Sequence, residues 1–195
     1  MGDTDPETVN ILHAAFDLEY NSGPDPRTES HLREPHPVRN KAYALKSSLH
    51  TIGAQLACHL TDGSFAHELP SCEPSNPLPT AYRFSHWRTA RVYTIHWSLT
   101  IILNKTLLKL LPTYEPSRYA LEAECSTIAL EICKTWENAW TNRPIGACHV
   151  WLGFVMAYEF CGDEVQSWIL GALNRLLEDQ GVGSGGGRRR WWGDV

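Results

Sequence analysis

The residues best suited to acid–base or metal chemistry are spread thinly along this sequence. His96 is separated along the chain from His149 and Glu159, so the three could share a reaction only if folding brought them into one pocket. The dipeptide Cys58-His59 has no second cysteine or histidine within a few residues, which a zinc site would need. From these patterns we predict no catalytic residue, no metal site and no cofactor.

The sequence signatures of common catalytic and phosphate-binding sites give no support for an enzyme either. The chain has no G-x-x-x-x-G-K-[ST] loop, no G-x-S-x-G turn and no H-E-x-x-H helix. The glycine tract at 181–187 precedes no predicted helix, so it lacks the context of a phosphate-binding loop. Glu122, Glu124 and Glu131 fall on the polar side of one predicted helix instead of converging on a pocket. We therefore predict that the protein is not an enzyme.

A group of basic and aromatic residues follows the glycine tract. Arg188, Arg189 and Arg190 precede Trp191 and Trp192, and such a combination can contact RNA, a membrane surface or an import receptor. Three arginines are few for specific binding, so a solvated tail is the simpler interpretation. The three arginines are the candidate targeting or interaction segment.

The apolar pattern predicts one long helix that organises the rest of the chain. Residues 84–111 contain no proline or glycine, and as one helix they would be about 42 Å long. Apolar residues surround this helix almost completely, while Arg91, Lys105 and Lys109 form one narrow basic side. A central core helix is therefore predicted. A membrane span is the competing interpretation, but these charges interrupt every window long enough to cross a bilayer.

Periodic apolar residues, separated by breaks that contain proline or glycine, divide the remaining sequence into further helices. The pattern predicts an all-α fold of about six helices, at 8–20, 38–60, 84–111, 117–140, 144–160 and 163–180. Irregular linkers are predicted at 21–37 and 61–83. Asp163 and Gln166 have the spacing of a capping box at the start of the last helix. The candidate core residues are Trp87, Trp97, Trp136 and Trp168.

The first predicted helix is short and amphipathic. Val9, Leu12, Phe16 and Tyr20 recur at steps of three and four, which places them on one side of a helix. Four prolines among polar and charged residues then predict the irregular linker at 21–37.

Length and composition are those of one globular domain with a sizeable core, since the chain has 195 residues of which 43% are hydrophobic. We divide it into an N-terminal helix and proline-rich linker (1–37), a helical domain (38–180) and a flexible Gly/Arg/Trp tail (181–195). The net charge of −5 gives no reason to expect broad binding to nucleic acid. Acidic residues stand near Met1 where a secretory signal would carry basic ones, so secretion is not expected.

The start of the long helix resembles a segment of a known family. A Phe-x-x-Trp-Arg-x-Ala opening followed by an aromatic-rich apolar helix is found here at Phe84, Trp87, Arg88, Ala90, Tyr93 and Trp97. This pattern resembles the long core helix in the C-terminal regulatory region of fungal zinc-cluster transcription factors, and the similarity extends over about half of the chain. The resemblance implies a regulatory helical domain that senses a metabolite or contacts other proteins, located in the nucleus or else in the cytoplasm.

The chain departs from that family in one respect that limits the comparison. The family's DNA-binding module requires six cysteines beginning Cys-x-x-Cys-x6-Cys, whose thiolates bridge two zinc ions. No Cys-x-x-Cys occurs in this sequence, so neither zinc nor direct DNA binding is expected.

The sequence therefore predicts a non-enzymatic regulatory or interaction domain, whose partner is a protein or a small apolar ligand. One alternative is a small helical enzyme in which groups such as His96, His149 and Glu159 converge. Another is a membrane-associated helical protein, held by the helix at 144–160 and by the arginine–tryptophan tail.

Overall fold

The computed structural model describes residues 37–179, and these residues are mostly helical with one small sheet. The predicted all-α class therefore holds in its broad form. The elements in chain order are α2 (Pro37–Thr61), β1 (Ala66–Pro70), β2 (Thr80–Phe84), α3 (Trp87–Leu110), α4 (Ser117–Cys133), α5 (Trp136–Thr141), α6 (Ile145–Tyr158) and α7 (Asp163–Asp179). The predicted helix at 8–20, the linker up to residue 36 and the arginine tail lie outside the described residues.

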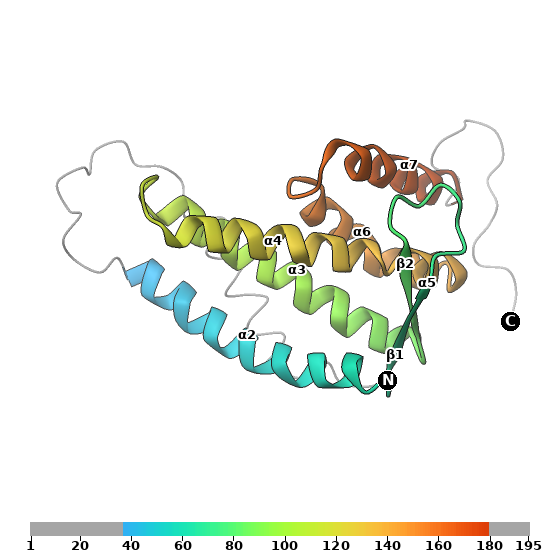
Figure 1. Ribbon diagram of the computed structural model, residues 1–195, viewed down its shortest axis with the longest axis horizontal. Coiled ribbons are helices and arrows are strands. Elements are labelled where there is room, and N and C mark those ends of the chain that lie inside the picture. Colours follow the sequence, from blue (N-terminus) through green and yellow to red (C-terminus); the bar gives the residue numbers. More distant parts are fainter. Residues whose placement is uncertain (1–36, 180–195) are drawn as a thin grey trace, which may run out of the picture.

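Helix α3 packs against α2, α4 and α6 (Figure 1). It begins at Trp87, later than the predicted start at Phe84, because Phe84 belongs to strand β2. His86 closes the start of the helix, since its Nδ1 accepts a hydrogen bond of 3.0 Å from the Arg88 backbone N–H. Leu107, near the other end of α3, is completely buried.

The predicted irregular linker at 61–83 is wrong in part, because this segment contains an antiparallel β-hairpin. Ala66 pairs with Phe84 and Pro70 pairs with Thr80 at the two ends of the strand pair. Tyr82 and Phe84 are buried while Arg83 between them is exposed, which is the alternation expected of a strand with one side on a core. Many prolines around the two short strands obscured this alternation in the sequence.

The single helix predicted at 117–140 is also corrected, because the structure divides it into α4 and α5. The break falls at Lys134, whose carbonyl oxygen accepts the Tyr82 backbone N–H at 2.8 Å. That carbonyl therefore joins the hairpin to the end of α4 instead of continuing the helical ladder. No proline or glycine marks the break, so the contact with the hairpin, and not local propensity, explains it.

Helix α7 begins where the sequence predicts, but without the predicted capping box. The Gln166 side-chain amide donates to the Cys161 carbonyl oxygen at 2.9 Å. It therefore closes the turn before the helix instead of accepting from the Asp163 backbone N–H. Asp163 lies in the first turn of α7, where a negative charge is favourable at the helix N-terminus.

Candidate interaction surface

The residues considered for an acid–base site do not converge. His96 lies on the side of α3 that faces α2, where its Nε2 is 3.0 Å from the Leu49 carbonyl oxygen. Burial there lowers the pKa of the His96 imidazole. Lys105, two and a half turns further on, lies on the opposite side of α3 and pairs with Glu159 at 2.9 Å. His96 and Glu159 are therefore separated by the width of α3.

His149 lies at a small cleft between α3, α5 and α6. Its ring stacks on Trp87 with centroids 5.6 Å apart and planes 9° apart, and burial lowers the pKa of its imidazole. The cleft has about 10 Å³ of space for the centre of a water molecule, which is room for about one water. A pocket for a metabolite has roughly 300–1,000 Å³. In this form the cleft is too small for an apolar ligand.

Three of the four candidate core tryptophans are buried. Trp136 is 0% exposed and its ring lies 5.7 Å from that of Phe154 and 6.1 Å from that of Trp168. Trp97 is also buried, on α3. Trp87 is partly exposed because it lies at the mouth of the cleft beside His149.

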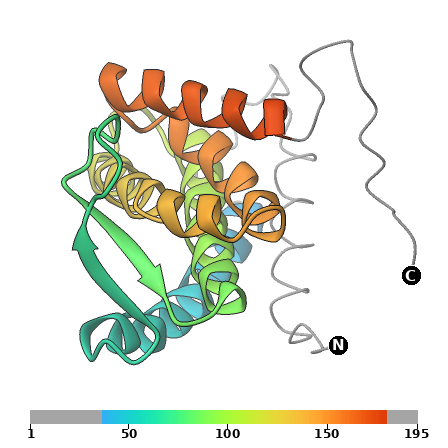
Figure 2. The ribbon, with the colours of Figure 1, turned by 90° about the vertical axis from the view of Figure 1, so that its right-hand side faces the viewer.

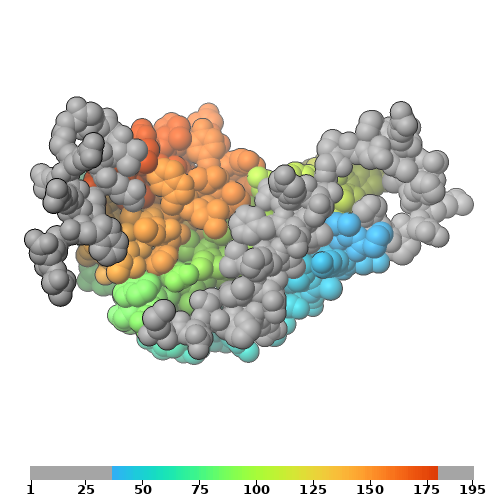
Figure 3. Space-filling model, turned by 180° about the vertical axis from the view of Figure 1, so that it is seen from behind, coloured from blue at the N-terminus to red at the C-terminus, as the bar shows by residue number. Residues whose placement is uncertain are grey.

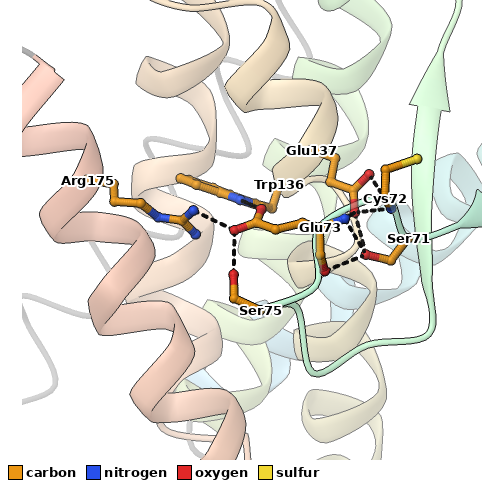
Figure 4. A network of polar contacts seen from close by, with 7 residues as sticks. All are labelled: Ser71, Cys72, Glu73, Ser75, Trp136, Glu137 and Arg175. Carbon is orange, nitrogen blue, oxygen red and sulfur yellow. Dashed lines mark hydrogen bonds and ion pairs between the residues drawn. The ribbon is translucent and has the colours of Figure 1, made fainter.

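A polar network fixes the loop between β1 and β2 against α5 and α7 (Figure 4). The Glu73 carboxylate accepts from the Trp136 indole N–H at 2.6 Å, the Ser75 hydroxyl at 2.7 Å and the Arg175 guanidinium at 2.5 Å. Burial alone would raise the pKa of Glu73, but these three hydrogen bonds together hold it below its ordinary value. A carboxylate whose oxygens all have donors is an anchor, not a free acid or base.

Glu137 at the start of α5 holds the same loop from the other side. Its carboxylate accepts the Cys72 backbone N–H at 3.0 Å and the Ser71 hydroxyl at 2.5 Å. No local pattern predicts these partners, because the pairs that define the network are up to 102 positions apart.

A second polar cluster joins α2, α3 and α4. Asn104 of α3 is 0% exposed, and its Nδ2 donates to the Glu124 carboxylate at 3.1 Å. The Lys46 ammonium of α2 donates to both Asn104 and Glu124. The prediction that Glu124 and Glu131 lie on the side of the helix predicted to be polar, but that side is not fully exposed to solvent. Glu124 is partly buried in this cluster, and Glu131 is partly buried as it accepts from the Tyr82 hydroxyl.

Described helices cover three sides of α3 and leave a fourth. Thr94 meets Gly153 of α6, His96 faces α2, and Asn104 faces α4. At 100° per residue, Val92 and Ile95 lie on the remaining side, opposite α4. Figure 2 shows α2 and α6 flanking this side, with no element of residues 37–179 over it. In Figure 3 the same face is seen from behind, with α3 between α6 and α2.

Apolar side chains from three helices line this face, which we call the α2–α6 seam. Its residues are Leu45, Ile52, Val92, Ile95 and Met156. Val92 is 50% exposed, and the other four are partly exposed and pack on one shared core cluster. On α2, Ile52 lies about 120° round the helix from Lys46, which turns to α4. The seam is therefore continuous from α2 to α6.

Basic residues border the seam along α3. Arg88, Arg91 and Lys109 are exposed, and none of them forms an ion pair with another residue of the described part of the chain. Lys105 lies between them along the helix and is already paired with Glu159. The sequence predicted this basic side of the helix, but not the two neighbouring helices that make it the border of an apolar face.

Comparison with protein-family models, curated proteins and solved structures found no match to this chain. The likeness to the fungal regulatory region thus stays a prediction from the residues at 84–97. Within residues 37–179, no group of three or more His, Cys, Asp or Glu side chains is arranged to hold a metal ion. None of the helices from α2 to α7 is both long and apolar enough to cross a membrane.

Proposed function

We propose that this protein is a non-enzymatic interaction module that binds an amphipathic, acidic helix of a protein partner along the α2–α6 seam. The observation that carries the proposal is an apolar face of α3 bordered by Arg88, Arg91 and Lys109. A helix that lays its apolar side into such a face and its acidic residues on the border is a common mode of peptide recognition. Opposite charges at the border would also speed association.

Two further considerations favour a protein partner. The cleft beside His149 has room for about one water molecule, so it offers a small apolar ligand little space. The seam, by contrast, extends over three helices. A regulatory role in transcription and a nuclear location, which the resemblance implies, belong to this proposal. In that setting the partner would be another component of the same regulatory system.

The proposal is tested with a synthetic amphipathic helix as the probe. A fluorescent peptide of about 15 residues, with leucines at helical spacing and glutamates elsewhere, is titrated with the full chain and followed by anisotropy. We expect saturable binding that Val92→Asp weakens at least tenfold, because the new carboxylate enters the apolar face. Arg91→Glu should weaken binding at low salt and much less at high salt, since the border charges are exposed and screened.

A matched control distinguishes the seam from general stickiness. Tyr119 on α4 is 77% exposed and lies away from the seam, so Tyr119→Asp adds the same charge elsewhere. Binding should be unchanged in this variant. Equal loss in Val92→Asp and Tyr119→Asp, or no saturable binding to the unmodified chain, would refute the proposal.

A further inference from the structure

We infer that the chain supplies its own first occupant of the α2–α6 seam, the amphipathic segment Thr8–Tyr20. This inference rests on the proposed function, because it assigns a regulatory ligand to the same surface. The segment lies outside the described residues, and the argument uses its sequence, its tether and the face it would meet.

The apolar pattern of the segment fits the seam. Val9, Leu12, Phe16 and Tyr20 would form one side of a helix, about 20 Å long. Helix α3 runs about 36 Å beside the seam, so the segment can lie along it completely. A short amphipathic helix is marginal alone in water and gains stability when its apolar side is covered.

Charge complementarity supports the same pairing. The first twenty residues carry five acidic side chains, Asp3, Asp5, Glu7, Asp17 and Glu19, and no Lys or Arg. The acids fall before and near the end of the segment. The basic residues of the border fall likewise at two ends of α3, with Arg88 and Arg91 at one and Lys105 and Lys109 at the other. An acidic helix along the seam therefore meets basic groups at both ends.

The tether is long enough to allow this return. Residues 21–36 join the segment to Pro37 at the start of α2, and fully extended they span up to about 55 Å. Lys46 of α2 contacts Asn104 of α3, so the two helices run antiparallel and Pro37 lies towards the Lys105–Lys109 end. The chain therefore enters the fold beside one end of the seam, and its high local concentration favours docking.

Docking in cis would make partner binding a competition. If the segment occupies the seam about 90% of the time, the apparent Kd of an outside helix rises about tenfold. The test is the peptide titration with the full chain carrying Leu12→Asp and Phe16→Asp, which spoil the apolar side of the segment. The control is Asn10→Asp with Ala14→Asp, which adds the same two charges off that side.

We expect the Leu12→Asp/Phe16→Asp variant to bind the probe at least tenfold more tightly than the unmodified chain. The Asn10→Asp/Ala14→Asp control should bind like the unmodified chain. Equal, saturable binding by all three would overturn the cis inference and leave the proposed function standing. Failure of the probe to bind any of them would refute the proposed function instead.

A second measurement decides the cis inference even if the probe never binds. A carbodiimide joins a carboxylate to a neighbouring lysine ammonium, and mass spectrometry identifies the linked peptides. We expect a link from an acid before residue 20 to Lys105 or Lys109, lost in the Leu12→Asp/Phe16→Asp variant. The Lys105–Glu159 pair at 2.9 Å is the positive control. Detection of that control link without any link to the N-terminal acids would overturn the inference.

Discussion

Replacement of Glu73 by alanine should destabilise the protein through one identifiable group, the Trp136 indole N–H. Trp136 is 0% exposed, and its N–H donates to the Glu73 carboxylate at 2.6 Å. Removing the acceptor leaves a buried donor unsatisfied, which costs about 1–3 kcal/mol. Loss of the Arg175 contact adds about 0–1 kcal/mol, because Arg175 is 37% exposed and screened by solvent. We therefore expect a loss of about 1–4 kcal/mol in the free energy of unfolding.

The assay is urea unfolding followed by circular dichroism and tryptophan fluorescence. Glu73→Gln should cost less than Glu73→Ala, because an amide oxygen can still accept from the indole. Glu122→Gln is the matched control, since Glu122 is 49% exposed and its contact with Arg118 is 3.9 Å long. Its effect should stay within about 0.5 kcal/mol. If Glu73→Ala costs no more than Glu122→Gln, then Glu73 does not hold the indole and the loop is not anchored as described.

The pH dependence provides an independent check on the same group. The pKa of Glu73 in the folded protein lies below its ordinary value. Its contribution is therefore fully present above the ordinary glutamate pKa of about 4.3 and is lost as the pH falls through the lower folded value. The stability gap between the unmodified chain and Glu73→Gln should narrow as the pH is lowered from 7 towards 3. A gap that widens would contradict the assigned hydrogen bonds.

Three other substitutions test the packing described above, each by urea unfolding. Trp168→Ala should cost about 3–5 kcal/mol, because the ring is buried against Trp136 and leaves a cavity; a neutral effect would remove α7 from the core. Gly146→Ala should cost about 1–3 kcal/mol, since a Cβ there would lie 2.4 Å from a backbone oxygen of α5. Gly171→Ala, with open space around its Cβ, should be neutral or stabilising. Lys46→Met should cost about 1–3 kcal/mol by stranding partly buried partners, and an unchanged midpoint would refute that role.

Local patterns predicted the helices whose boundaries depend on local chemistry. The apolar stripe at 38–60 corresponds to α2, Pro37–Thr61, and Asp163 does begin α7. The start of α3 was displaced because Phe84 continues an alternating strand, Tyr82-Arg83-Phe84, whose signal was present but short. Where a boundary is set by neighbours in sequence, the sequence was sufficient.

Boundaries and contacts set by distant residues could not be predicted. The break at Lys134 depends on a backbone hydrogen bond to Tyr82, and the Glu73 anchor depends on Arg175, 102 positions away. The candidate surface lies between these cases. The basic side of α3 follows from residue spacing, but the placement of Ile52 and Met156 beside it comes from tertiary packing alone.

The way the hairpin is attached bears on self-association at high concentration. A small sheet with open sides is a template onto which a second copy can add a strand. Here β2 uses one side for β1 and gives the Tyr82 N–H on the other side to the Lys134 carbonyl. Strand β1 carries exposed His67 and Glu68 and ends at Pro70, which has no N–H to donate. The end of α4 and the composition of β1 thus protect this protein against edge-to-edge aggregation.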